Sequence, residues 1–238
     1  MTKAIFFDLD DTLCDSRQAW SVAESQAIRY FMEQCPDLSE SGIYDAWRSV
    51  QTQLMVKLRE GRLTMAAVRD RRFKETLELL CVPDDGLAEQ LSLVLSETYL
   101  ANIAVFEDTG VLDELRPDFY VGIVTNGAAD DSADSQHTKI QQLGLAGRVD
   151  GIWISDEVGF RKPDSRIFEA ACEGASVSPV EAAFAGDSAE NDIVGANRAG
   201  LTSILIDRMN HFQSNGDTEA HPAYRIEDLR EIPSILKG

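Results

Sequence analysis

The sequence predicts an α/β protein with a parallel sheet and an all-helical segment inserted after its first strand. Three features of the 238-residue chain support this prediction: short apolar runs recur along it, helical stretches separate the later runs, and one long stretch after the first run is helical throughout. Apolar runs that alternate with helices are typical of a parallel sheet covered by helices. The length suits one or two domains.

The first expected strand is the apolar run at residues 4–7, which ends abruptly in the acidic segment 8–12. A run without alternating polar residues is typical of a strand buried on both faces, as in parallel sheets. Similar runs predict four further strands, at 119–124, 151–154, 182–185 and 202–206. Helices are predicted between the later strands, at 135–143, 164–173 and 191–199.

The stretch from 15 to 103 contains no convincing strand. Its apolar residues recur at three- and four-residue spacing, which predicts amphipathic helices, as at Trp20, Ala23, Ala27, Tyr30 and Phe31. Interruptions are expected at Gly42, Gly61 and residues 82–86. We therefore expect an α/β core at 1–14 and 105–238, and a helical insertion at 15–104. A surface loop is expected at 211–222, before a last short element at 224–236.

Composition and charge exclude several classes of protein. With 22 basic and 41 acidic residues the net charge is −19, which argues against binding to nucleic acid, because affinity for phosphate backbones comes from clustered Lys and Arg. The apolar runs are shorter than a membrane span, and the first residues do not resemble a secretory signal. We expect a cytoplasmic monomer or homodimer.

The cysteine spacing and the absence of common catalytic motifs exclude further classes of protein. The four cysteines lie far apart without a C-x-x-C pair, which favours buried, reduced thiols over disulfides or a zinc site: Cys14, Cys35, Cys81 and Cys172. The chain has no G-x-S-x-G, no G-x-x-x-x-G-K-[ST] and no G-x-G-x-x-G after a strand. The motif signals of serine hydrolases and of two large nucleotide-binding folds are therefore absent.

Chemically useful side chains follow four of the expected strands. The carboxyl ends of parallel strands meet at one edge of the sheet, where α/β proteins place their sites. The side chains expected to meet there are Asp8 and Asp10 after the first strand, Thr125 and Asn126 after the second, Lys162 after the third, and Asp187 and Asp192 after the fourth.

Carboxylates gathered at one edge raise each other's pKa unless a cation neutralises them. Oxygen ligands suit a hard divalent ion, and we expect Mg²⁺, although Mn²⁺ accepts the same ligands. Lys162 adds a fixed positive charge, and Thr125 and Asn126 add uncharged hydrogen-bonding groups. Such a set is suited to binding a phosphoryl group and stabilising its charge during transfer.

Four short motifs carry a resemblance to a known family. In chain order they are DLDDT (8–12), TN (125–126), KPD (162–164) and GDSAEND (186–192), each after an apolar run. In these motifs and in its helical insertion, the chain resembles the haloacid dehalogenase superfamily, in its phosphatase branch with a helical cap. The resemblance covers the whole length and implies a Rossmann-like core with the cap inserted after the first strand.

The resemblance also implies roles for individual residues. Asp8 would be the nucleophile that forms an aspartyl-phosphate, and Asp10 the general acid and then the general base. The metal ligands would be the carboxylates of Asp8 and Asp187 and the backbone carbonyl of Asp10. The phosphoryl oxygens would be held by Thr125, the backbone at Asn126 and Lys162. Asp192 would hold Lys162 or a metal-bound water in place, and Thr12 would brace the loop after the first strand.

Two segments depart from the family pattern, and one cap cluster is open to two interpretations. Asp11 stands where many relatives carry Gly, and the acidic stretch 128–135 is unusually long and could alter access to the site. In the cap, Arg69 and Arg72 share a helix face. They could meet the tail of a substrate, or form a solvated face with local pairs to Asp70 and Glu75.

The function we expect is Mg²⁺-dependent hydrolysis of a small phosphorylated metabolite, of the nucleoside monophosphate or the sugar and acyl-sugar phosphate class. A cap that closes over the site would exclude large substrates. A sugar phosphomutase shares every core motif and stays an alternative, as does a catalytically inactive binding protein on the same fold. A dehalogenase would not need Asp10, and a phosphonatase would need a cap lysine and usually departs from D-x-D.

Overall fold

The chain divides into two compact units, each of which is described by itself. In the computed structural model, residues 1–130, 135–209 and 220–237 are described. The core unit comprises residues 1–16, 104–129 and 136–238, and the helical unit comprises residues 17–103 and 130–135. Most of the expected loop at 211–222 lies outside the described residues.

The core unit is built on a six-stranded sheet in which every strand pairs in parallel with its neighbours, in the order β3-β2-β1-β4-β5-β6. The strands are β1 (Ala4–Phe7), β2 (Tyr120–Thr125), β3 (Gly151–Ile154), β4 (Ala182–Gly186), β5 (Thr202–Ile206) and β6 (Tyr224–Ile226). The predicted α/β class with a parallel sheet is confirmed. The last strand, β6, was expected only as part of an unspecified short element.

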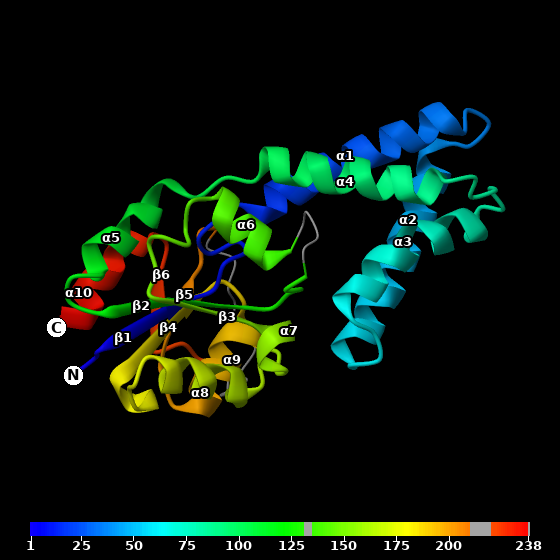
Figure 1. The fold of residues 1–238 in the computed structure, drawn as a ribbon. Helices are drawn as coiled ribbons and strands as arrows, with labels where there is room; N and C mark the ends of the chain where they lie inside the picture. Colours follow the sequence, from blue (N-terminus) through cyan, green and yellow to red (C-terminus); the bar gives the residue numbers. More distant parts are fainter. Residues whose placement is uncertain (131–134, 210–219, 238) are drawn as a thin grey trace. The chain divides into compact units, whose positions relative to one another are not determined.

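Helices cover both faces of this sheet. Figure 1 shows α8 (Ser165–Gly174) and α9 (Val194–Ala199) on one face, and α5 (Val111–Leu115), α6 (Gln136–Gln142) and α10 (Ile232–Lys237) on the other. On the first face Phe168 of α8 packs edge-on against Phe184 of β4, with ring centroids 4.9 Å apart. Phe6 of β1 belongs to the same buried cluster, and all four residues of β1 are buried. The first strand is therefore a central, fully covered strand, as its unbroken apolar run predicts.

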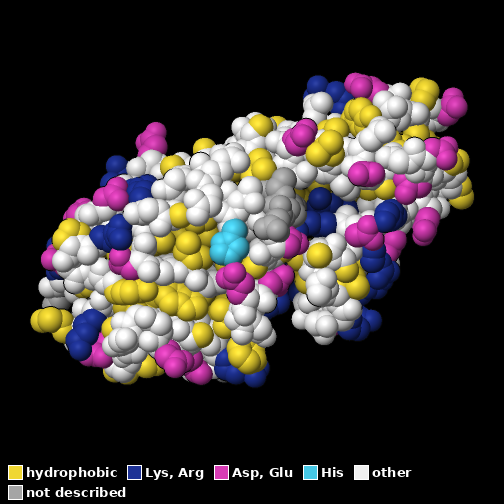
Figure 2. Space-filling model, in the orientation of Figure 1, with side chains coloured by type: hydrophobic (Ala, Val, Ile, Leu, Met, Phe, Trp, Pro, Cys, Tyr) yellow, Lys and Arg dark blue, Asp and Glu magenta, His cyan; other side chains and the backbone are white. Residues whose placement is uncertain are grey.

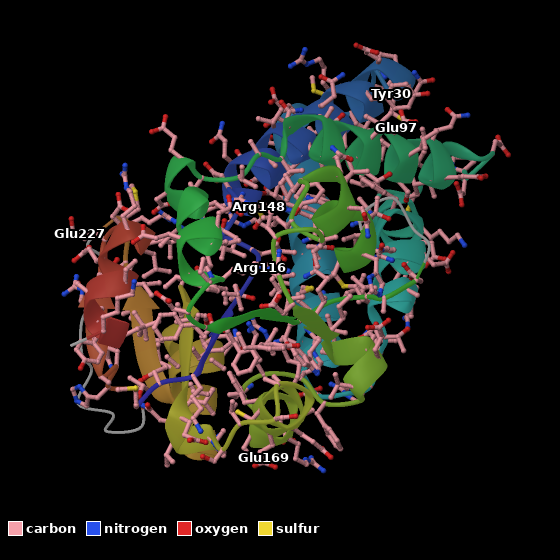
Figure 3. The ribbon with its side chains drawn as sticks, turned by 60° about the vertical axis from the view of Figure 1, so that its left-hand side comes forward. Tyr30, Glu97, Arg116, Arg148, Glu169 and Glu227 are labelled. Atoms are coloured by element: carbon pink, nitrogen blue, oxygen red, sulfur yellow. The ribbon has the colours of Figure 1, made fainter. Side chains whose placement is uncertain are left out.

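Two arginines fasten the segment around α5 to the segment that precedes β3 (Figure 3). Arg116 donates to the carboxylate of Asp150 at 2.8 Å, and Arg148 donates to the carboxylate of Asp113 at 2.8 Å. The second oxygen of Asp150 accepts from the backbone N–H of Val121, at the start of β2, at 2.9 Å. These contacts join the amino ends of β2 and β3 to each other and to α5.

The helical unit consists of four helices: α1 (Ser16–Gln34), α2 (Glu40–Arg59), α3 (Met65–Leu79) and α4 (Leu87–Asn102). Trp47 of α2 stacks on Phe73 of α3 with centroids 4.5 Å apart. Tyr30 of α1, which is labelled in Figure 3, donates to Gln90 of α4 at 2.6 Å. Gly42 does not interrupt the helices as expected, because Ser39 caps α2 by accepting from the Gly42 N–H at 3.1 Å, which places Gly42 in the first helical turn.

The remaining elements are short: the 3₁₀ turns Glu107–Gly110, Pro179–Glu181 and Leu229–Glu231, the helix α7 (Ser155–Val158), and a π-helical turn at Ala189–Ile193. The helix predicted at 191–199 is therefore a π-helical turn that continues into α9. All four cysteines are free. Cys14 and Cys172 are buried as expected, whereas Cys35 is only partly buried and Cys81 is exposed, since each follows the end of a helix, α1 and α3 respectively.

Among the described residues, no helix is both long enough and apolar enough to cross a membrane.

Candidate active site

The site is assembled at the carboxyl ends of three adjacent strands. Phe7 at the end of β1 lies in register with Ile123 of β2 on one side and Ala185 of β4 on the other. Asp8 follows β1 directly, Thr125 ends β2, and Asp187 follows β4 directly. Parallel pairing in this register therefore brings polar residues from three distant parts of the sequence to one edge of the core unit.

Lys162 joins two of the predicted carboxylates. Its Nζ donates to Asp8 Oδ1 at 2.6 Å, lies 2.7 Å from Asp192 Oδ1, and donates to the backbone carbonyl of Val124 at 3.0 Å. Lys162 is only 5% exposed. Burial alone lowers the pKa of a lysine, but the charges of Asp192 and Asp8 reverse the effect and hold the pKa of Lys162 above its usual range. The lysine is therefore a fixed cation inside an acidic site.

Three carboxylates form a cluster that could hold a metal ion. Asp8, Asp187 and Asp192 each offer a carboxylate oxygen, and these oxygens lie within 4.8 Å of one another. Burial raises the pKa of Asp8 to about 7, although Lys162 opposes the shift. Burial and the charge of Asp8 raise the pKa of Asp187 to about 8. Buried carboxylates that repel each other in this way favour a divalent cation, and an all-oxygen donor set suits Mg²⁺.

Within this cluster, Asp192 is engaged by the protein itself. One oxygen forms the ion pair with Lys162, and the other accepts from the backbone N–H of Ser188 at 2.9 Å. A Cβ atom at Gly186 would lie 2.3 Å from Asp192 Oδ2, so only glycine at this position lets the carboxylate approach the end of β4. Both carboxylate oxygens of Asp192 are therefore in contact with the protein itself.

Asp10 has a different set of partners from Asp8. Lys139 Nζ donates to both of its carboxylate oxygens, at 2.6 and 2.8 Å, and Gln136 Nε2 donates to Oδ2 at 2.9 Å. Burial tends to raise the pKa of Asp10, but the Lys139 charge and the Gln136 hydrogen bond outweigh it and leave the pKa lowered. The two aspartates, although only two residues apart, therefore differ in their nearest charged partners and in the direction in which the pKa is shifted.

Gln136 and Lys139 were not among the residues expected at the site from the sequence. Both lie on α6, three residues apart and so on one face of that helix, and both are buried. Their sequence signal is two polar residues at helical spacing between the second motif and the next strand. Polar residues on a helix are usually solvated, so that signal is weak.

Thr125 and Asn126 lie beside Lys162 but differ in what their side chains do. The Thr125 hydroxyl accepts from Gln136 Nε2 at 2.9 Å. The side chain of Asn126 bonds the backbone of Lys162 twice: Oδ1 accepts from Lys162 N–H at 2.8 Å, and Nδ2 donates to the Lys162 carbonyl at 3.0 Å. The Asn126 side chain therefore positions the lysine, and only its backbone is left for the expected contact with a phosphoryl group.

The loop after β1 explains the departure at Asp11. Asp11 has φ 60°, in the left-handed region where glycine is favoured and aspartate is tolerated among the other residues. Its carboxylate accepts from the Ser16 hydroxyl at 3.2 Å. The Thr12 side chain is buried, and the Thr12 carbonyl accepts from Arg208 at 2.8 Å. The loop that carries Asp8 and Asp10 is therefore bonded to Ser16 and Arg208.

The cap arginines belong to the helical unit and are described with it. Figure 2 shows basic side chains of this unit gathered over α2 and α3, with acidic side chains among them. The local pairs on α3 are Arg71 with Glu75 and Lys74 with Asp70. Arg69 instead pairs with Asp130 at 2.8 Å, and the Arg72 guanidinium is buried over the rings of Trp20 and Phe73. These contacts of Arg69 and Arg72 therefore differ from those of Arg71 and Lys74, whose partners are Glu75 and Asp70.

Of the acidic stretch 128–135, residues 131–134 lie outside the described residues.

Comparison with known proteins shows which family the chain is similar to. A family model of haloacid dehalogenase-like hydrolases matches residues 2–200. The chain is 30% identical to a glyceraldehyde 3-phosphate phosphatase of Methanopyrus kandleri, covering 100% of this chain and 98% of the relative. It is 27% identical to the pyrimidine 5'-nucleotidase YjjG of Escherichia coli, covering 98% and 96%. Among solved structures, a 2-haloacid dehalogenase from Pseudomonas syringae is similar, with a TM-score of 0.75, 26% identity and coverage of 100% and 99%.

Proposed function

Because the chain belongs to the haloacid dehalogenase-like hydrolases, we propose that it is a Mg²⁺-dependent phosphatase that acts on a small phosphomonoester through an aspartyl-phosphate intermediate. The family resemblance of its four sequence motifs is confirmed by the family match. The observation that carries the proposal is that Asp8 and Asp10 each pair with a different lysine. Asp8 lies against Lys162 at 2.6 Å, and Asp10 lies against Lys139 at 2.6 Å, so one site contains two carboxylates with distinct partners.

In the first half of the proposed reaction, a carboxylate oxygen of Asp8 attacks phosphorus. The bond from phosphorus to the leaving oxygen breaks, and Asp10 gives that oxygen its proton. The Asp10 carboxyl has a lowered pKa in the substrate-free protein, and a phosphoryl group entering beside it would favour the protonated form by charge repulsion. Lys162 would meet the negative charge of the phosphoryl oxygens as the group reaches Asp8.

In the second half, water attacks the phosphorus of the aspartyl-phosphate, and Asp10 takes the proton from that water. The bond between phosphorus and the Asp8 oxygen breaks, which releases phosphate and restores the Asp8 carboxylate. Thr125 and the backbone at Asn126 would donate hydrogen bonds to the phosphoryl oxygens through both steps. Asp192 and the Asn126 side chain would keep Lys162 in position, as they do in the structure.

The residues present fit a divalent metal ion. The carboxylates of Asp8 and Asp187 and the backbone carbonyl of Asp10 would hold it, and their raised carboxyl pKa values support a role for a cation. When bound, Mg²⁺ supplies positive charge that neutralises the phosphoryl oxygens and the nucleophile. Mn²⁺ accepts the same oxygen donors.

The proposed substrate is a small phosphorylated metabolite, of the nucleoside monophosphate or the sugar and acyl-sugar phosphate class. The names of the similar phosphatases, one for glyceraldehyde 3-phosphate and one for pyrimidine nucleotides, support this range. The similar structure of a 2-haloacid dehalogenase points to another reaction within the family. Cleavage of a carbon–halogen bond has no leaving oxygen to protonate, so that reaction would give Asp10 no role.

The test is phosphate release from a panel of nucleoside monophosphates, sugar phosphates and acyl-sugar phosphates, with Mg²⁺ and with a chelator. The matched variants are Asp8→Asn and Asp118→Asn, which removes an exposed carboxylate paired with Lys237. The proposal expects release that needs the metal, is lost in Asp8→Asn and persists in Asp118→Asn. Undiminished turnover in Asp8→Asn would contradict the mechanism. Transfer between sugar positions without phosphate release would indicate a phosphomutase instead.

A further inference from the structure

We propose that Lys139 and Gln136 are positioning residues that hold the Asp10 carboxylate in place for its acid–base role. This inference rests on the proposed function, because it assigns a role to two residues through the acid–base group of that reaction. Neither residue lies in the four sequence motifs; both come from α6, which follows the second motif.

The first argument is the placement of Lys139. Its side chain is 6% exposed, and its Nζ reaches both carboxylate oxygens of Asp10 at 2.6 and 2.8 Å. Removing a lysine from water is costly and is tolerated when a well-aligned opposite charge compensates. Two contacts to two oxygens also restrict rotation of the carboxylate, which a single contact would not do. Lys139 therefore fixes both the position and the orientation of the Asp10 side chain.

The second argument is that Gln136 joins Asp10 to the end of β2. The same Nε2 atom lies 2.9 Å from Asp10 Oδ2, 2.9 Å from Thr125 Oγ1 and 2.8 Å from the Asn126 carbonyl. One amide group therefore sets the distance between the proposed acid–base group and the loop proposed to bind phosphate. General acid catalysis depends on such distances, because a proton moves efficiently only between groups at hydrogen-bond range.

A third observation concerns the backbone opposite Gln136. A Cβ atom at Gly127 would lie 2.5 Å from Gln136 Cγ and 2.7 Å from its Nε2. The glycine therefore leaves the space through which the Gln136 side chain reaches Asp10 and Thr125. The start of α6 is also tied to this loop, since the Gln136 N–H donates to the Ala128 carbonyl at 3.0 Å. The loop and the helix together form a support for Asp10.

The test exploits the fact that only a poor leaving group needs a proton from Asp10. Two substrates of similar shape are compared under Mg²⁺: p-nitrophenyl phosphate, whose leaving group departs readily, and benzyl phosphate, whose alkoxide does not. The value of kcat/KM is the one to compare, since it reports the steps up to formation of the aspartyl-phosphate and leaves out its hydrolysis. Competitive inhibition by inorganic phosphate reports whether the phosphate site itself is intact.

We expect Lys139→Met to lower kcat/KM for benzyl phosphate roughly 10- to 100-fold, which is only part of the roughly 10²- to 10⁴-fold that acid–base catalysis contributes, because Asp10 itself remains. The value for p-nitrophenyl phosphate should fall less than about threefold. The inhibition constant of phosphate should stay within about twofold. Lys139→Arg, which keeps the charge and the donors, should recover part of the loss. Lys237→Met, which removes an exposed ion-paired lysine of the same unit, should match the wild type.

Gln136→Met serves as the second variant if Lys139→Met does not fold, and it should show the same selectivity for the poor leaving group. Equal losses on both substrates would overturn the proposal, because they would show no link to protonation of the leaving oxygen. A weakened phosphate inhibition with an unchanged leaving-group dependence would overturn it too, since Lys139 would then act on phosphate binding. If the wild-type protein hydrolyses no phosphomonoester, the proposed function fails first, and the two failures are thereby distinguished.

Discussion

The side-chain amide of Asn126 holds the backbone of Lys162 at both ends, accepting from its N–H at 2.8 Å and donating to its carbonyl at 3.0 Å. These two bonds join the residue after β2 to the loop between α7 and α8. They place the Lys162 ammonium against Asp8 without adding charge to the site.

Asn126→Ala should therefore lower both stability and turnover. Two partly buried hydrogen bonds are lost, each worth about 1 kcal/mol, so we expect a loss of roughly 1–3 kcal/mol in the free energy of unfolding. The Lys162 side chain should become less well placed, with a fall in kcat of about tenfold or more. Denaturant unfolding and steady-state kinetics measure the two effects. Asn102→Ala, at an exposed position near the end of α4, is the matched control and should change neither.

Gly186→Ala should displace Asp192 from its position beside the end of β4. The added Cβ would lie 2.3 Å from Asp192 Oδ2, which must move and so weaken its ion pair with Lys162. We expect a loss of roughly 1–3 kcal/mol in stability and most of the activity, as for overpacking of a close-packed interior. Gly110→Ala meets no atom within 4 Å and is the control. Wild-type behaviour of Gly186→Ala would show that Asp192 is not held where the structure places it.

The metal-free protein should lose stability as the pH rises from about 4 to about 8. An unperturbed aspartate carboxyl titrates at 3.8, whereas the pKa values of Asp8 and Asp187 are about 7 and about 8 in the folded chain. Between these limits the folded state binds more protons than the unfolded state. The stability that these groups contribute is therefore present at low pH and lost as the pH passes through the folded-state values.

Mg²⁺ should displace those protons, so its effect should grow with pH. For each proton displaced, the affinity for the metal should rise roughly tenfold per pH unit up to the folded-state pKa values. Thermal melts with Mg²⁺ and with EDTA, from pH 5.5 to pH 8.5, measure the gain in melting temperature. A gain of equal size at every pH would contradict the involvement of these two carboxylates.

Asp187→Asn should have two separate effects, one on metal binding and one on the stability of the metal-free protein. The substitution removes a proposed metal ligand, so we expect Mg²⁺ affinity to fall by at least the roughly 10–100-fold that loss of an outer partner costs. It also removes a charge that repels Asp8, so the metal-free variant should melt at a higher temperature than the wild type at pH 8. Calorimetric titration and thermal melts check the two parts. Asp118→Asn, at an exposed site, should leave both unchanged.

Much of the fold could be predicted because the strands of a parallel sheet are buried on both faces. Ala4–Phe7 and Ala182–Gly186 are fully buried, and their unbroken apolar runs predict strands without further information. The edge strand Tyr224–Ile226 was not recognised, since Tyr224 and Arg225 are exposed and leave only Ile226 as a buried signal. Gly42 was expected to interrupt the helices because glycine disfavours helix interiors, but a capped first turn tolerates it.

The site was less predictable than the fold, because a sequence motif identifies residues but does not show which side chains form hydrogen bonds or ion pairs with them. The order of the motifs locates Asp8, Lys162 and Asp187 along the chain, and the parallel sheet explains why they meet. Nothing in the spacing indicates that Lys139 reaches Asp10, since that contact depends on how α6 packs in three dimensions. The side chain of Asn126 is a similar case. Its residue type fits several roles, and only the structure shows that it bonds the Lys162 backbone.

The central place of β1 has a consequence for how the chain is made. Phe7, next to Asp8, pairs with Ile123 and Ala185, so the strand synthesised first finds its two neighbours only late in synthesis. The insertion helices pair within one continuous stretch, as Tyr30 with Gln90 shows, and such contacts form fast. A nascent chain that ends before β4 leaves the apolar first strand with an unpaired edge, the kind of surface through which incomplete chains aggregate. Translation of this protein should therefore place its greatest demand on chaperones before residue 182 emerges from the ribosome.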